Sequence, residues 1–375
     1  MVFFRRRKKP QQQKSEAYHA RQAEIERMIA AEPAPREVTE QEMWGHVFNP
    51  AIQALENADF GKLDELYAAQ PDSEHRVVWW HALRNALPEY SGGRRQALFE
   101  GALRHDSAVS LMLASNLAVL FGFEARGEGT SDSVTIEGGF GFYEWNVGGR
   151  ELMERAAELS DHSDPFAYIV GHGASITDDD CGLAHAKKWQ AIDPWNPMGW
   201  AELLRQQDAR WSGDWQALPL MARYVAEQAP DGHPVLAEVV SMLNQHWFTL
   251  RSFGEFSSED ATAAAWRNAE SAYTVAHAFA KFSSAYDDGI RALRLWDRFA
   301  FGLAEAGLYE ELLDVMRRQK GRYYALWQDR YRDPAHTYGW CRAEAFQVKF
   351  RRTRPLPEDA HDDVDWGPKG PPNVA

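Results

Sequence analysis

From about residue 15 to residue 350, apolar residues recur at intervals of three and four, and no segment sustains an alternation of apolar and polar residues. Intervals of three and four place apolar side chains on one face of a helix, whereas a half-buried strand needs a period of two. The segments "HRVVWWHALRNAL" (75–87) and "AVSLMLASNLAVLFGFEA" (108–125) are examples. The pattern therefore predicts an all-α fold without a sheet.

Glycine, proline and polar residues divide this region into segments of helical length. Ser257 and Ser258 are good N-cap candidates because acids follow them in the first turn, and Pro50 should bend or split its helix. The weakest exception to the helical pattern is the β-branched "DSVTIE" (132–137). The expected helices after the first 125 residues lie near 148–159, 165–175, 181–192, 197–210, 214–229, 233–250, 258–286, 288–306, 308–320 and 334–348. Further helices are expected at 14–32 and 39–58.

Prolines that precede a large apolar residue by six positions indicate how these helices are arranged. Pro194 precedes Trp200 and Pro230 precedes Leu236, the spacing of tetratricopeptide-type repeats. "GDWQAL" (213–218) is similar to the turn between the two helices of such a repeat. We therefore expect an α-α superhelix of stacked antiparallel helix pairs, tetratricopeptide-like but degenerate.

Three longer stretches resemble a group of bacterial helical-repeat proteins without an established function. They are "EARGEGTSDSVTIEGGFGFYE" (124–144), "AIDPWNPMGW" (191–200) and "ARWSGDWQALPLMARYVAEQAP" (209–230). The resemblance covers roughly residues 57–345. It implies the helical-repeat fold and a regular Gly-rich insertion, and it implies no activity, cofactor or catalytic residue.

Composition divides the chain into three regions. Residues 1–14 should form a basic flexible N-terminus, residues 15–354 the helical-repeat domain, and residues 355–375 an acidic Pro-rich disordered tail. Outside residues 1–14 the chain holds 35 basic and 55 acidic side chains, a net charge of −20. Because such a body repels phosphate backbones, we expect no nucleic-acid partner for it.

Location is inferred from the cysteines and the N-terminus. The two cysteines lie far apart and form no disulfide or zinc pattern, and no run has the length and apolarity of a signal peptide or membrane span. We expect a cytoplasmic protein that is either free or peripheral at the inner membrane face. Such a contact would be weak and would use two aromatic residues and five cations: Phe3, Phe4, Arg5, Arg6, Arg7, Lys8 and Lys9.

The densest cluster of polar side chains is "HGASITDDDCGLAH" (172–185). His172, Cys181 and His185 are residue types that bind metals, and the last two are four positions apart on one helix face. The alternative is structural, because "TDDD" (177–180) is also typical of the start of a helix. An N-cap residue is followed there by acids that the positive end of the helix dipole stabilises. The structural interpretation is the stronger of the two.

Two other features are candidates for binding. The Gly-rich insertion at 126–142 lacks the ending of a phosphate-binding loop, but Arg126 would suit an anion. Trp195 and Trp211 lie in expected connections between helices, where an exposed tryptophan can anchor a partner.

The sequence shows no set of nucleophile, base and orienting residue, so we expect a non-enzymatic protein-interaction scaffold without a cofactor. Its acidic helical-repeat surface should favour a protein or basic peptide partner. One alternative is a metal- or anion-dependent enzyme that uses residues 172–185 and the Gly-rich insertion. The other is a peripheral membrane adaptor held by the basic N-terminus.

Overall fold

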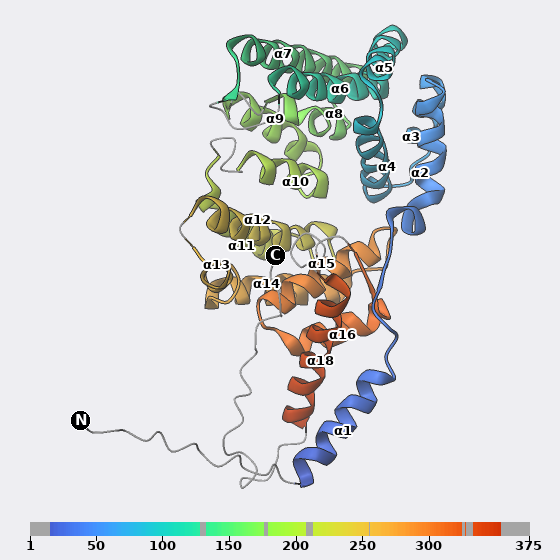
Figure 1. Cartoon of the computed structure of the whole chain (residues 1–375). Helices are drawn as coiled ribbons and strands as arrows, with labels where there is room; N and C mark the ends of the chain where they lie inside the picture. Colours follow the sequence, from blue (N-terminus) through green and yellow to red (C-terminus); the bar gives the residue numbers. More distant parts are fainter. Residues whose placement is uncertain are drawn as a thin grey trace, which may run out of the picture. The chain divides into compact units, whose positions relative to one another are not determined.

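The computed structural model of the chain describes residues 16–127, 133–175, 179–207, 213–254, 256–324, 327 and 333–353. In these residues the fold is all-α, as predicted, and every element is a helix except two strands of two residues each (Figure 1). The chain divides into two compact units. We call residues 1–37 and 307–375 the terminal unit and residues 38–306 the central unit.

Among its described residues, the terminal unit combines the two strands with the helices α1, α16 and α18. Its elements are α1 (Glu16–Ala30), β1 (Arg36–Glu37), α16 (Tyr309–Gln319), β2 (Arg322–Tyr323) and α18 (Pro334–Thr353). The strands pair in parallel with Arg36 opposite Arg322, and the N–H of Arg36 donates to the carbonyl oxygen of Gly321 at 2.8 Å. The prediction of no sheet is wrong here, because two paired residues are too few to produce an alternating pattern.

The central unit contains all other elements, joined by short connections. They begin with α2 (Glu40–Glu56), α3 (Phe60–Ala68), α4 (Ser73–Ala86), η1 (Leu87–Glu89), α5 (Gly92–His105), α6 (Ala108–Arg126) and α7 (Ile136–Leu159). They continue with α8 (Phe166–Ile169), η3 (His172–Ser175), α9 (Asp179–Ile192), α10 (Pro197–Gln206), η5 (Trp215–Ala217) and α11 (Leu218–Gln228). The last are η6 (Pro234–Ala237), α12 (Glu238–Phe253), α13 (Ser258–Ala265), α14 (Ala269–Ala285) and α15 (Ala292–Glu305).

Helix α2 is fixed at its start by a capping box. The Thr39 hydroxyl accepts from the N–H of Glu42 at 3.2 Å, and the Glu42 carboxylate accepts from the N–H of Thr39 at 3.0 Å. Pro50 lies inside this helix, which continues to Glu56. The helix is therefore not split at Pro50, and the alternative, a bend, stays a prediction. Pro50 is exposed, and the burial of Phe48 and Ala51 on the inner face holds the two halves in one helix.

The predicted helix 258–286 is two helices in the structure. Ser257 caps the first, α13, as predicted, because its hydroxyl accepts from the N–H of Asp260 at 3.1 Å. Asn268 caps the second, α14, and accepts from the N–H of Ser271 at 2.9 Å. Trp266 ends α13 with its side chain fully buried, so the chain is anchored in the core where its direction changes.

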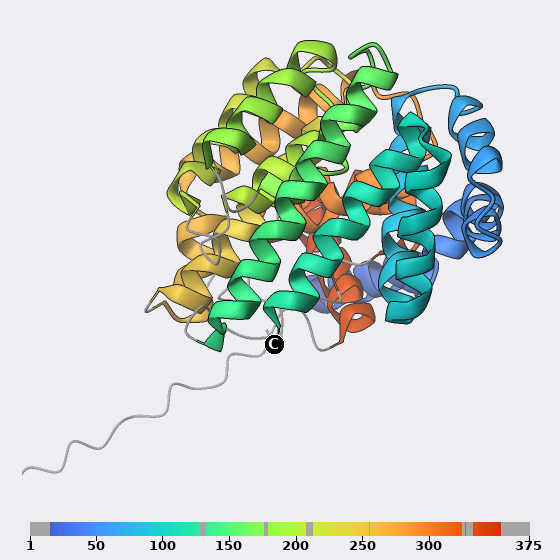
Figure 2. The same ribbon diagram turned by 90° about the horizontal axis from the view of Figure 1, so that it is seen from above.

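The Gly-rich stretch expected as an insertion at 126–142 is largely helical. Only residues 128–132 lie outside the described residues, and α7 begins at Ile136 behind the N-cap Thr135. A Cβ at Gly138 would lie 2.9 Å from the carbonyl oxygen of Ala125 on α6, and one at Gly141 would lie 3.0 Å from its Cβ. These glycines therefore let α6 and α7 pack closely side by side (Figure 2).

Among the described residues, α6 alone is long and apolar enough to cross a membrane, with a mean hydropathy of 1.6. The expectation that no segment has this character is therefore wrong for α6. However, 72% of its most apolar window is buried inside the structure. Long apolar helices also occur in the cores of globular proteins, so the length and hydropathy of α6 do not by themselves indicate a membrane span.

The connection between α9 and α10 is a tight, tryptophan-rich turn. Asn196 caps α10 and accepts from the N–H groups of Met198 and Gly199 at 3.0 and 3.2 Å. The Trp200 indole donates to the carbonyl oxygen of Pro194 at 2.9 Å. Gly199 faces the buried Trp189 ring, which an added Cβ would approach to 2.9 Å. The unusual composition of this segment is thus explained by its role in the fold.

Candidate functional site

A pocket of about 370 Å³ lies in the central unit where four helix connections meet. This volume is within the range of small-molecule and side-chain binding sites. The lining residues come from the starts of α4, α10 and η6 and from the connection between α14 and α15. They are Asp72, Ser73, Glu74, His75, Asp193, Pro197, His233, Pro234, Asp287, Gly289 and Ile290. The lining contains four carboxylates and neither lysine nor arginine.

Local capping interactions fix three of the four walls. The Asp72 carboxylate accepts from the N–H of His75 at 2.9 Å and starts α4. The His233 ring accepts at Nδ1 from the N–H of Val235 at 3.2 Å and starts η6. Asn196 starts α10, as described above. Side chains at N-caps are favoured when they accept backbone N–H groups, which explains the polar residues at these positions.

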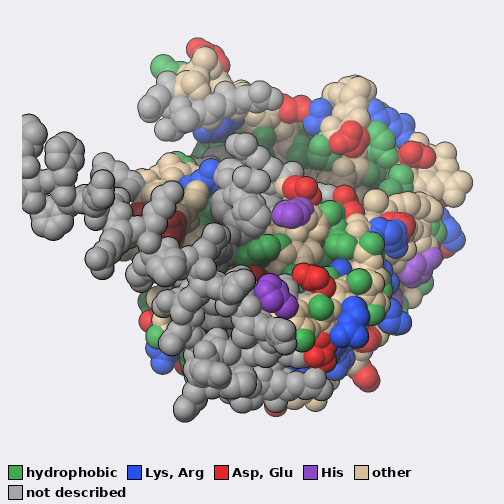
Figure 3. Space-filling view, turned by 60° about the horizontal axis from the view of Figure 1, so that its bottom comes forward, with side chains coloured by type: hydrophobic (Ala, Val, Ile, Leu, Met, Phe, Trp, Pro, Cys, Tyr) green, Lys and Arg blue, Asp and Glu red, His purple; other side chains and the backbone are tan. Residues whose placement is uncertain are grey.

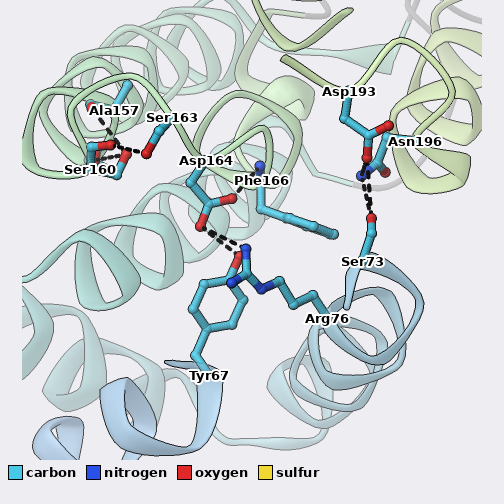
Figure 4. A network of polar contacts seen from close by, with 11 residues as sticks. Tyr67, Ser73, Arg76, Ala157, Ser160, Ser163, Asp164, Phe166, Asp193 and Asn196 are labelled. Carbon is cyan, nitrogen blue, oxygen red and sulfur yellow. Dashed lines mark hydrogen bonds and ion pairs between the residues drawn. The ribbon is translucent and has the colours of Figure 1, made fainter. Parts of the chain in front are cut away.

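A polar network joins two of these walls (Figure 4). The Ser73 hydroxyl donates to Oδ2 of Asp193 at 3.2 Å. The Asn196 amide donates to the same oxygen at 3.0 Å and to the Ser73 hydroxyl at 3.2 Å. Asn196 is fully buried, and Asp193 is half-buried. The start of α4 is therefore held against the turn before α10, although about 120 residues separate them.

The fourth wall, the connection between α14 and α15, is held by two tryptophans and a tyrosine. The Trp44 indole donates to the carbonyl oxygen of Ile290 at 2.8 Å, and the Trp296 indole donates to Asp288 at 2.9 Å. The N–H of Gly289 donates to the Tyr286 hydroxyl at 3.2 Å. These bonds give the connection a defined conformation although it contains no helix.

A partly buried acid of the lining lies near a buried cation that is outside the lining. Glu74 lies directly against Gly289, where an added Cβ would be 3.0 Å from its Oε2. Burial raises the pKa of the Glu74 carboxyl, and the nearby Arg291 partly opposes this effect. Arg291 is 3% exposed and lies 3.8 Å from the buried carboxylate of Glu238. Arg291 shares this carboxylate with Arg298, which lies closer to it.

One of the two histidines of the pocket, His233, adds little positive charge at neutral pH. Burial lowers the pKa of His233, although the carboxylate of Asp193 acts in the opposite direction. The ring of His75 pairs at 2.8 Å with Asp72, which already serves as a helix cap. Asp287 is exposed at the mouth of the pocket. The four carboxylates therefore dominate the charge of the lining.

The residues predicted as metal ligands have other surroundings. Both ring nitrogens of His185 have partners: Nδ1 lies 2.9 Å from the hydroxyl of Ser175, and Nε2 lies 3.0 Å from the carboxylate of Glu154. His172 is 1% exposed, and burial lowers its pKa to about 4. The side chain of Cys181 lies outside the described residues. In the described part of the chain no three histidine, cysteine or acidic side chains could hold a metal ion. The metal site stays a prediction.

The sequence gave no indication that Ser175 and Glu154 contact His185. A serine, a histidine and an acid in this order are the groups of nucleophilic catalysis. However, Ser175 is fully buried, so its hydroxyl is closed to a substrate in this conformation. The Lys188 ammonium also binds Glu154. Among the described residues this cluster is a closed polar network that joins α7, η3 and α9.

A second buried network lies beside His172. Glu202 on α10 is 4% exposed and pairs with Arg84 on α4 and with Arg205 one turn further along α10. Burial alone would raise the pKa of Glu202, but the two guanidinium groups outweigh burial and hold the pKa at about 2. The network therefore joins α4 to α10 on the side of these helices away from their capped starts.

The structure places only some of the predicted interaction residues. Trp195 is half-buried in the α9–α10 connection, and Arg126 is the last residue of α6. Trp211, Thr177 and Asp178 lie outside the described residues. The same holds for residues 1–14, including the proposed membrane contact, and for the tail at 355–375.

The pocket residues were missed by sequence reasoning, although a signal for them was present. Asp72 directly follows Pro71, and Asp193 directly precedes Pro194, one of the prolines that mark helix junctions. His233 lies three residues after Pro230, another of these prolines. Acids and histidines beside junction prolines would therefore have indicated a polar site. No motif showed that these junctions meet.

Comparison of the chain with models of known protein families gives no match, and a search of curated proteins finds no relative.

Proposed function

We propose that the protein is a non-enzymatic interaction scaffold whose central unit binds a basic side chain of a peptide partner in the acidic pocket. The observation that carries this proposal is the lining, which has four carboxylates and no lysine or arginine around about 370 Å³. A guanidinium or ammonium group complements such a lining, because it carries the opposite charge and donates several hydrogen bonds.

Helix dipoles alone do not neutralise this pocket. Each helix start carries about half an elementary positive charge, and four connections meet here. Even a full contribution from each of four helix starts would offset only about half of the four carboxylates. Arg291, whose charge is divided between Glu74 and the Glu238 that it shares with Arg298, offsets at most one more carboxylate. The pocket therefore keeps a negative charge that a cation would neutralise.

The pocket, rather than a broad acidic face, is the basis for this proposal. On the face of the molecule seen in Figure 3, acidic side chains (red) and basic side chains (blue) are interspersed among hydrophobic ones. Mixed surfaces of this kind offer little net attraction at physiological ionic strength, since exposed charges are screened over about 8 Å. A pocket concentrates charge of one sign in a small partly enclosed volume, where screening is weaker.

The short connections between helices support a scaffold built from stacked helices. In the central unit, α9 and α10, α11 and α12, and α14 and α15 each follow one another across a short connection. All three connections contribute to the pocket. In a superhelix of such pairs, equivalent connections lie along one edge, which is a usual place for a peptide to bind.

The test is binding of an arginine peptide to the full chain. The probe is an octapeptide of glycine and serine with one central arginine, and the control probe carries citrulline instead. Ligand-observed NMR or calorimetry gives the dissociation constant at low and at high salt. We expect binding only of the arginine peptide, and weaker binding at high salt.

Two charge-reversal variants separate the pocket from the overall charge of the protein. Asp287→Lys places an ammonium group at the mouth of the pocket, and we expect binding at least about tenfold weaker. Glu158→Lys makes the same change of net charge at an exposed site on α7, and it should have little effect. Equal losses for the two variants, or binding of the citrulline peptide, would contradict the proposal.

A further inference from the structure

Next to the pocket, three aromatic rings form a stacked cluster. The ring of Trp195 lies 6.0 Å from that of Trp200 with an interplanar angle of 11°. The ring of Tyr224 on α11 lies 6.1 Å from Trp195 and 6.0 Å from Trp200. Trp200 is almost fully buried and serves as the base of the cluster.

The outer part of this cluster is exposed. Tyr224 is 52% exposed, and Leu220 is 65% exposed one helical turn earlier on the same face of α11. We call Trp195, Leu220 and Tyr224 the aromatic shelf. Large apolar side chains that lie together at the surface frequently mark a contact site, because leaving them in water is unfavourable.

The aromatic shelf and the pocket share one turn of the chain. Asp193 and Pro197 line the pocket, and Trp195 lies between them, two residues from each. This turn is rigid because Trp200 binds the carbonyl oxygen of Pro194 and because Asn196 is fully buried. A ligand seated in the pocket therefore has an apolar surface within reach of its neighbouring residues.

Charges around the aromatic shelf favour the same ligand as the pocket. Glu227 and Glu270 are exposed beside it and share Arg223, which lies 2.7 and 3.3 Å from their carboxylates. Asp231, in the connection after α11, is also exposed and lies 4.0 Å from the ammonium of Lys281. In this group three acids outnumber two cations, so a basic segment is attracted and an acidic one is repelled.

We propose that the aromatic shelf binds an aromatic or large aliphatic side chain located two to four residues from the basic residue that occupies the pocket. The ligand is an extended peptide, which advances about 3.3 Å per residue and so can reach both places. The basic side chain supplies the charge recognition. The apolar side chain stacks on Trp195 and Tyr224 and supplies additional buried area. This inference rests on the proposed function of the pocket.

The experiment compares two peptides that differ at one position. The first is the octapeptide with one arginine, and the second has phenylalanine three positions after that arginine. We expect the second to bind the wild-type chain about tenfold more tightly, since a buried aromatic ring adds both area and stacking. Binding should also change the tryptophan fluorescence, because Trp195 contacts the ligand.

Two tyrosine variants test the aromatic shelf itself. In Tyr224→Ala the preference for the phenylalanine peptide should fall to about twofold or less, while the arginine peptide binds as before. Tyr273→Ala is the matched control, because Tyr273 is an exposed tyrosine (62%) on α14 outside the shelf. It should keep the tenfold preference. Circular dichroism confirms that both variants are folded.

The outcomes distinguish this inference from the proposed function. Equal affinity of the two peptides for the wild-type chain, with loss of both in Asp287→Lys, overturns the aromatic shelf and leaves the pocket in place. An unchanged preference in Tyr224→Ala also overturns the shelf. If neither peptide binds, both proposals fail.

Discussion

Replacing Glu202 by glutamine should destabilise the central unit in a way that depends on pH. The glutamine keeps the size of the side chain but removes the charge that pairs with Arg84 and Arg205. Glu202 is 4% exposed, so solvent screens this pairing little. The two guanidinium groups would then face each other without a carboxylate between them, which typically costs about 3–5 kcal/mol for a buried pair.

The pKa of Glu202 gives an independent magnitude. Its value falls from 4.5 to about 2 in the folded state. One pKa unit corresponds to about 1.4 kcal/mol, so the charged form contributes about 3 kcal/mol. Because the folded pKa lies below the unfolded one, this stabilisation is complete above pH 4.5 and is lost as the pH falls to about 2. The two magnitudes agree.

The assay is urea unfolding followed by tryptophan fluorescence. Twelve of the 15 tryptophans lie in the central unit, so the signal reports mainly on that unit. We expect Glu202→Gln to lower the free energy of unfolding by about 3 kcal/mol at pH 7 and by much less at pH 3. Glu158→Gln, at an exposed site, should change it by less than about 0.5 kcal/mol. A loss below about 1 kcal/mol at pH 7, or an equal loss at both pH values, would refute the reasoning.

Four further substitutions test the packing, a helix cap and the pH dependence of stability. Gly199→Ala should lower the free energy of unfolding by about 1–3 kcal/mol, because the new Cβ meets the Trp189 ring at 2.9 Å. Gly139→Ala places its Cβ where no atom lies within 4 Å, and it should stabilise α7 by up to about 1 kcal/mol. Urea unfolding of both variants checks the opposite signs, and two losses of equal size would contradict the packing argument. Asn196→Ala removes the cap of α10 and should cost about 0.5–2 kcal/mol in the same assay, and an unchanged midpoint would show that the cap is unimportant. His172→Gln should reduce the loss of stability between pH 6.5 and about 4, because burial depresses the pKa of His172 and the unfolded state takes up the proton first. The same slope in variant and wild type would contradict this.

The all-α fold could be predicted because it depends on local patterns. Ser257 starts α13 as an N-cap of the expected type, and α16 and α18 begin within one residue of the expected positions. The errors arose where tertiary packing, rather than the local sequence, determines the conformation of a segment. The glycines after Thr135 suggested a loop, but Gly138 and Gly141 are required by the close approach of α6 and α7. A single sequence cannot distinguish these two reasons for glycine.

The candidate site could not be predicted for a related reason. Asp72, Asp193 and Asp287 each look like ordinary polar residues at a helix boundary, and nothing local indicates that they meet. In the cluster that did attract attention, residues 172–185, the polar side chains that the structure describes, His172, Ser175 and His185, are buried. His185 has partners at both ring nitrogens, one of which comes from Glu154 on a different helix. The segment with the most closely spaced polar residues belongs to a structural network, whereas the pocket is formed by residues that lie far apart in the sequence.

The bond from the Trp44 indole to the carbonyl oxygen of Ile290 connects positions 246 residues apart. One wall of the pocket belongs to α4 near the beginning of the central unit, and the opposite wall precedes α15 at its end. During synthesis, a nascent chain must emerge from the ribosome to about residue 290 before these walls can meet. The proposed binding of a partner therefore requires synthesis of nearly the whole central unit. A shorter fragment would contain acidic residues of the lining but would not form the pocket.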